Sequence, residues 1–177
     1  MDLVYTGTKM EHGHETGLSC DDPLIADALG QLLGPLAKGL LFDTPPGSLL
    51  QRGLAGRVAV TGATGPLYLA DLLERGPRAL IAGCRSVDEL ARVLQTLPEP
   101  GSGEPFYYGP ALGRLPLTRA ERRVLRTYLT EDTLEAAAAR AGIKKKTAAN
   151  RIALIKEKLG VKTHGQLLRA YFSGPEA

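Results

Sequence analysis

The sequence has little cysteine and no long apolar stretch. Two cysteines, Cys20 and Cys84, in 177 residues are too few for a disulfide framework, so we expect free thiols. No apolar run approaches the ~18 to 20 residues that a membrane-spanning helix needs. The first residues also lack the basic-then-apolar layout of a signal peptide. These absences argue against a disulfide-rich secreted protein and a membrane protein, and they favour a cytoplasmic one.

The composition is that of a globular protein, with 44% hydrophobic and 23% charged residues. The net charge of +3 is unevenly distributed. Residues 1–110 contain 8 Lys and Arg against 13 Asp and Glu, a balance of −5, whereas residues 111–177 contain 14 against 6, a balance of +8. A compact basic end suggests a polyanionic partner. A basic surface that is only solvated would give the same charge balance. The arrangement of the charges must therefore distinguish it from a surface that binds a polyanion.

The front half alternates short apolar runs with helical periods. Residues 40–42, 58–60 and 79–83 are typical of buried strands. Helical spacing follows in residues 23–36, 66–76 and 86–97, and residues 1–6 could add a strand. Strands that alternate with helices predict parallel pairing, so the expected fold here is an α/β domain with a parallel sheet.

The stretch rich in Pro, Gly and Ser at residues 98–110 predicts a boundary without regular structure. The expected organisation is therefore an α/β domain over residues 1–97, a linker over 98–114 and an all-α domain over 115–177. In the last of these, helical segments are expected at residues 117–129, 133–142, 144–160 and 163–174. Thr118 with Glu121 three residues on forms a capping-box pattern.

The third of these segments has two different faces. At 100° per residue, its aliphatic side chains share a narrow sector and should point inward; they are Ala148, Ile152, Ile155 and Leu159. The opposite face combines small residues, Asn150 and, at its start, three lysines. Such a face suits a DNA major groove, because small residues let the backbone approach and Asn can bond to an adenine edge. An ordinary amphipathic helix with solvated lysines is the alternative.

The last 60 or so residues resemble the LuxR/NarL-type helix-turn-helix domain. The matching residues are Leu117, Thr118, Glu121, Val124, Leu125, Gly142, Ile143, Thr147, Asn150, Lys158, Leu159, Gly160 and Val161. Lys144 replaces the usual Ser or Thr cap, which weakens the cap by ~1 kcal/mol; Ala148 and Arg151 also depart from the family pattern. A sigma-factor helix-turn-helix is similar in its middle, but the tail KLGVKTHGQLL favours LuxR/NarL.

The resemblance implies site residues as well as a fold. The expected DNA-binding residues are Lys144, Lys145, Lys146, Thr147, Ala149, Asn150, Arg151, Ala153 and Lys158. Of these, Ala149, Asn150 and Ala153 would face the bases. The last helix commonly forms the dimer contact in that family, and Leu167, Leu168 and Tyr171 would supply it here.

The sequence TGATG, residues 61–65, invites comparison with two families. It resembles the phosphate-binding turn of extended short-chain dehydrogenases. However, Tyr68 occupies the third glycine position, and a Tyr-x-x-x-Lys pair is missing. The alternative is the second half of a response-regulator receiver domain, shortened and degenerate, in which the glycines serve the turn rather than a ligand.

The receiver resemblance places Asp43 at the phosphoacceptor position and Thr61 at the switch hydroxyl. Asp21 and Asp22 resemble the acidic pair that holds Mg²⁺. Ala82 stands where a lysine normally pairs with the phosphoryl group, and loss of that cation disfavours phosphorylation. The competing interpretation is that the carboxylate of Asp43 only stabilises a turn or caps a helix.

The sequence therefore predicts a transcriptional regulator that binds double-stranded DNA as a homodimer, without enzymatic activity, cofactor or bound metal. RNA polymerase is a further candidate partner. Two alternatives stay open: a regulator switched by phosphorylation of Asp43, and a nucleotide or NAD binder that uses residues 61–65. His12 and His14, between Glu11 and Glu15, could hold a metal but are more typical of a solvated loop.

Overall fold

The computed structural model describes residues 18–99 and 103–174. The front half contains α1 (Pro23–Leu33), η1 (Gly34–Ala37), β1 (Leu40–Phe42), η2 (Ser48–Gln51), β2 (Val58–Thr61), α2 (Pro66–Leu73), β3 (Ala79–Ala82), α3 (Val87–Gln95) and β4 (Phe106–Tyr108). The second half contains α4 (Arg119–Thr130), α5 (Leu134–Ala141), α6 (Lys145–Lys158) and α7 (His164–Phe172). The possible strand at residues 1–6 and the pair His12 and His14 lie outside the described residues.

The four strands form one parallel sheet in the order β1-β2-β3-β4, which confirms the expected α/β class. Its register pairs Leu40 with Val58, and Val58 with Ala79. Parallel neighbours need long crossover connections, and α2 and α3 belong to those connections.

The prediction that residues 98–110 lack regular structure is wrong for residues 106–108. Phe106–Tyr108 form β4, which pairs in parallel with β3 and extends the sheet. Three consecutive aromatic residues suit an extended, half-buried strand. The Pro- and Gly-rich flanks on both sides concealed so short a strand in the sequence.

Side-chain caps begin most of the longer helices. The cap residues whose side chains accept first-turn amide hydrogen bonds are Asp22, Ser86, Thr118, Thr133 and Thr163. The capping box of Thr118 and Glu121 is present. At α6 the cap residue is Lys144, which makes no such bond, as the sequence predicts.

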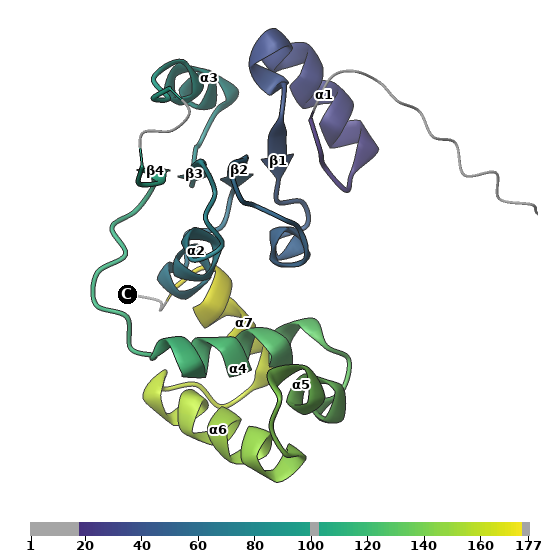
Figure 1. Cartoon of the computed structure of the whole chain (residues 1–177), viewed down its shortest axis with the longest axis vertical. Coiled ribbons are helices and arrows are strands. Elements are labelled where there is room, and N and C mark those ends of the chain that lie inside the picture. Colours follow the sequence, from purple (N-terminus) through teal and green to yellow (C-terminus); the bar gives the residue numbers. More distant parts are fainter. Residues whose placement is uncertain (1–17, 100–102, 175–177) are drawn as a thin grey trace, which may run out of the picture.

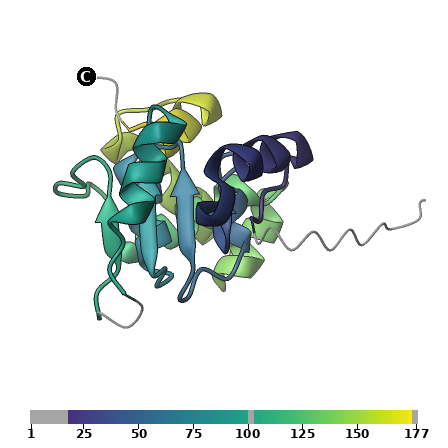
Figure 2. The same cartoon turned by 90° about the horizontal axis from the view of Figure 1, so that it is seen from above.

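The sheet separates two apolar layers, because alternate residues of a strand point to opposite faces. One layer, with Leu40, Val60 and Ile81, packs against α1 and α3. The other begins with Leu41, Ala59 and Leu80 and continues through α2 into α4, α6 and α7. Figures 1 and 2 show this order, with the C-terminal helices on the α2 side of the sheet. The two halves therefore share one continuous core.

The position of α7 corrects one expectation. The sequence suggests four helices packed as a unit, and α4, α5 and α6 do contact one another extensively. However, α7 packs mainly against α2 of the front half (Figure 1).

Among the described residues, no helix is long and apolar enough to cross a membrane.

Candidate nucleic-acid interface

The two faces of α6 lie as the sequence predicts. Ala148, Ile152 and Ile155 are buried, the last with none of its surface exposed. Asn150 and Ala153 are exposed on the opposite side, with the exposed Ala149 at its edge. Arg151 is exposed and lies nearer the buried side, and Thr147 is half-buried. Figure 1 places α6 beyond α4, on the side of the molecule away from the sheet.

A short turn connects α5 to α6. Gly142 ends α5 with a left-handed φ of 71°, a conformation that glycine adopts without strain. The amide of Ile143 donates to Ala138 O at 3.0 Å and closes the helix end. The helices α5 and α6 contact each other, and both contact α4.

The four lysines expected to contact DNA differ in their surroundings. Lys145 forms an ion pair with Glu135 of α5, and Lys158 pairs with Glu121 of α4 at 2.5 Å. The bond from Lys158 holds the pKa of Glu121 below its usual range. Lys144 and Lys146 are exposed and have no ion-pair partner within the described residues. These two are the ammonium groups most free to meet phosphate.

Two of the three residues expected at a dimer contact lie inside the molecule. Leu167 and Tyr171 are completely buried, and Leu168 is half-buried. Tyr171 makes an edge-on ring contact with Tyr68 of α2, with centroids 5.6 Å apart. In this arrangement Leu167 and Tyr171 cannot contact a second molecule. The expectation that these side chains form a dimer contact is therefore wrong for the arrangement described here.

The turn at residues 61–65 holds the C-terminal end of α7 rather than a ligand. The amides of Thr64 and Gly65 both donate to Phe172 O, at 3.1 and 2.8 Å. A side chain at Gly65 would meet Tyr171 O at 2.2 Å, so glycine is required for this close approach. In a nucleotide-binding turn such amides would face phosphate. Here a carbonyl group occupies them, which disfavours the nucleotide or NAD alternative.

A buried charged cluster connects α2 to α4 and α7. Asp71, 1% exposed, accepts from Arg122 Nε at 3.1 Å and from the Tyr171 hydroxyl at 2.7 Å. Arg126 lies 3.6 Å from the same carboxylate, and Arg122 also pairs with Glu74. Buried charges are tolerated only when they are paired in this way. The cluster therefore favours the packed arrangement of the two halves.

Asp43 is equally enclosed. It is 4% exposed, and its Oδ2 accepts from the Thr61 hydroxyl at 2.6 Å and the Tyr68 hydroxyl at 2.7 Å. Oδ1 accepts from the Gly47 and Leu49 amides at 2.9 and 3.2 Å, and from the Ser48 hydroxyl at 3.3 Å. The structure thus brings Thr61 to Asp43, but five neutral donors occupy the carboxylate. It acts as the cap of the η2 turn.

The other receiver-like residues do not complete a phosphorylation site. Asp22 caps α1, and Asp21 pairs with Arg52. Residues 18–99 and 103–174 contain no cluster of three potential metal-ligating side chains. Ala82, at the expected lysine position, is buried at the end of β3.

A cationic groove beside α4 was not expected. Its arginines come from the turn after α2 and from α4, α5 and α6, and they are Arg75, Arg119, Arg123, Arg126, Arg140 and Arg151. Glu74, which pairs with Arg119, also lines the larger part of the groove. The sequence contains a signal for it, because RAERRVLR at residues 119–126 repeats arginine at helical spacing. The partner residue Arg75 is far away in the sequence, so only the fold brings it here.

No family model matches the chain, and no curated protein matches it. Among solved structures it is similar to RcsB from Salmonella enterica serovar Typhimurium, bound to promoter rprA in the presence of phosphomimetic BeF3−, with 18% identity and a TM-score of 0.42. That likeness covers 82% of this chain and 80% of RcsB. A structure of two RcsB dimers bound to two parallel DNAs gives 18% identity and a TM-score of 0.32, with 85% and 82% covered. Both likenesses are too distant to carry an argument about function.

Proposed function

We propose that the chain is a sequence-specific transcriptional regulator that binds double-stranded DNA through the outer face of α6. The observation that carries this proposal is the exposure of Asn150 between two exposed alanines, on a helix whose aliphatic side is buried. Its resemblance to LuxR/NarL-type sequences, described above, supports the same surface.

The chemistry of this face fits a major groove. Ala149 and Ala153 leave room for the backbone to approach, and Asn150 can form two hydrogen bonds with an adenine edge. Lys144, Lys146 and the amides at the start of α6 would hold phosphates and set the register. Thr147 and Arg151 flank the base-reading residues, while Lys145 and Lys158 must first leave their carboxylates.

Fluorescence anisotropy with labelled duplexes, selected from a random pool by the protein itself, tests the proposal. Replacing both Lys144 and Lys146 with alanine should weaken binding to all duplexes alike. The slope of log K against log salt concentration should become shallower by about 2, because about two phosphate contacts are lost. Lys38→Ala, an exposed lysine of the front half, is the control.

Asn150→Ala should instead relax preference at one base pair, by ~1 to 3 kcal/mol of discrimination. If selection yields no preferred sequence, or if neither α6 variant alters binding, the surface is wrongly assigned.

We further propose that the protein is not controlled by conventional phosphorylation of Asp43. Its carboxylate is occupied by five donors, and Tyr68 would have to leave before a phosphoryl donor could approach. Incubation with acetyl phosphate and Mg²⁺ should leave the intact mass unchanged. A gain of one phosphoryl group in the native protein that is absent in Asp43→Asn would contradict this proposal.

The proposed homodimer needs a change in the position of α7. Leu167 and Tyr171 now pack within the chain, so a contact through them requires α7 to leave α2. A contact with RNA polymerase stays a prediction of the sequence.

A further inference from the structure

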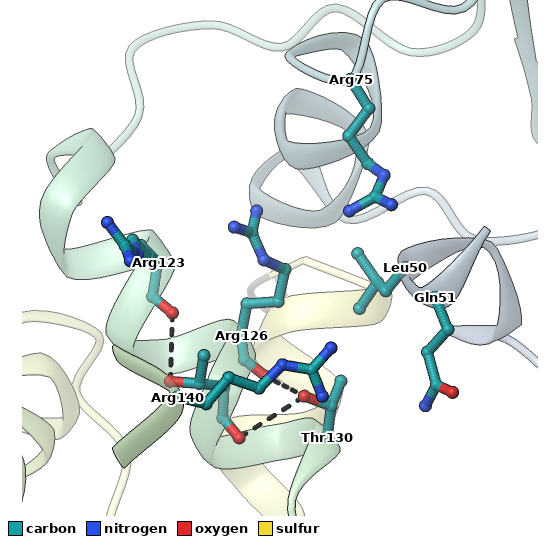
Figure 3. A pocket seen from close by; sticks show the side chains of 8 residues that line it. Leu50, Gln51, Arg75, Arg123, Arg126, Thr130 and Arg140 are labelled. Atoms are coloured by element: carbon teal, nitrogen blue, oxygen red, sulfur yellow. Dashed lines mark hydrogen bonds between the residues drawn. The ribbon is translucent and has the colours of Figure 1, made fainter. Parts of the chain in front are cut away.

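A cavity of about 190 Å³ lies between the end of α2, η2 and the helices α4 and α5 (Figure 3). A second cavity of about 650 Å³ shares Arg75, Arg123 and Arg126 with it and extends along α4. One wall comes from the front half and the other from the second half. The two spaces form a groove, which we call the arginine groove.

The smaller cavity is lined by four arginines and no carboxylate. Arg75 reaches it from the end of α2, and Arg126 approaches from α4 (Figure 3). The remaining lining is polar except for Leu50 and includes Gln51 and Thr130. Such a lining offers donors to an anion and almost no apolar surface to a neutral ligand.

The arginines are incompletely neutralised by the protein. Arg140 pairs with Glu131, and Arg126 lies 3.6 Å from Asp71, which it shares with Arg122. Arg123 has no ion-pair partner among the described residues. Arg75 donates one hydrogen bond, to Arg52 O at 2.6 Å, whereas its Nε is buried without a partner.

The surroundings of Arg75 disfavour its charge. Burial lowers the pKa of its guanidinium, and the neighbouring cation Arg126 lowers it further. Two guanidinium groups from different halves thus line the same cavity, and an anion between them would offset their repulsion.

We propose that the arginine groove binds a small anion carrying at least two phosphate groups, which joins Arg75 of the front half to Arg123 and Arg126 of α4. Guanidinium groups match phosphate oxygens with paired hydrogen bonds. Four arginines line the smaller cavity, enough donors for more than one phosphate group. No aromatic side chain lines either cavity, so the groove recognises the phosphates and not a base.

The DNA backbone fits this site less well. The smaller cavity is recessed between the two halves, and a rigid duplex on the outer face of α6 would leave it empty. Arg151 lies at the α6 end of the larger cavity and is the residue that a duplex and the groove could share.

Isothermal titration of the full chain with pyrophosphate and tripolyphosphate at low salt tests the proposal. Both should bind, and both should bind more tightly than orthophosphate or sulfate. Arg123→Gln, which breaks no ion pair of the described structure, should weaken pyrophosphate binding about tenfold. Arg57→Gln, an exposed arginine away from the groove, should leave it unchanged.

The Lys144 and Lys146 double variant separates this site from DNA binding, because it should lose duplex affinity and keep pyrophosphate affinity. The proposal is overturned if pyrophosphate does not bind, or if Arg123→Gln and Arg57→Gln bind it equally. It is also overturned if Arg123→Gln weakens only duplex binding, because the groove would then be part of the DNA interface.

Discussion

Individual tyrosines in this molecule donate hydrogen bonds to buried carboxylates. Tyr68 donates to Asp43 and Tyr171 donates to Asp71, at 2.7 Å in each case. Burial and then the adjacent carboxylate raise the pKa of each phenol far above its ordinary value. Both hydroxyl groups are therefore protonated throughout the neutral range, and each keeps one carboxylate oxygen satisfied.

This arrangement predicts a loss of stability in alkali. The folded pKa values are raised, so the stabilisation is fully present below the unfolded value of about 10 and is lost as the pH rises above it. Each tyrosine should add up to about 1.4 kcal/mol per pH unit to the decline. Urea unfolding between pH 9 and 11 should show it, and Tyr68→Phe should make the slope shallower. An unchanged slope in this variant would contradict the assignment.

Single residues also mark the limit of what the sequence predicts. The receiver resemblance implies that Asp43 and Thr61 belong to one site, and the structure does bring them together. It does not predict that Tyr68 closes over Asp43, since that contact depends on how α2 lies on the sheet. The same limit applies to Arg75, whose neighbours in the groove lie some 50 residues further along the chain.

At the scale of elements, α6 begins without the side-chain cap that starts α4, α5 and α7. Lys144→Ser should supply an oxygen for a first-turn amide and stabilise the protein by ~1 kcal/mol. Lys144→Ala removes the same charge without providing an acceptor, so it is the matched control. Urea unfolding midpoints should differ between the two variants. Equal midpoints would mean that water already satisfies these amides.

The contact between α2 and α7 depends on one glycine. In Gly65→Ala the new methyl group would meet Tyr171 O, and the overpacked contact should cost about 3 kcal/mol. Amide hydrogen exchange measured by NMR should show loss of protection at Thr64 and Gly65, whose amides bond to Phe172 O. Gly62→Ala lies in the same turn with nothing within 4 Å and should change little. Equal protection of these amides in both variants would contradict the proposed role of Gly65 in the contact between α2 and α7.

The helices and the parallel sheet were predictable because their signals are local: apolar periods, cap residues and a glycine after α5. The strand β4 was concealed because three residues give too short a pattern. The position of α7 was not predictable from its own sequence. Its packing on α2 depends on Gly65 and Asp71, which belong to the other half.

At the scale of the whole molecule, the two halves are joined by a shared core and by the Asp71 cluster. Docking of α7 on α2 and dimerisation through α7 use the same side chains, so they exclude each other. The closed arrangement described here therefore predicts a monomer, and a dimer requires α7 to be released. Any condition that weakens the cluster should favour the dimer.

Asp71→Asn tests this competition most directly. The substitution removes the charge that faces Arg122 and Arg126, and loss of one partner of a buried ion pair typically costs about 3 to 5 kcal/mol. Sedimentation velocity should then show a shift from monomer to dimer that adding Leu167→Lys abolishes. Asp88→Asn, an exposed acid of α3, makes the same charge change and should stay monomeric. If Asp71→Asn is also monomeric while small-angle scattering shows that it has opened, α7 is not the dimer contact, because nothing would then keep it from a second molecule.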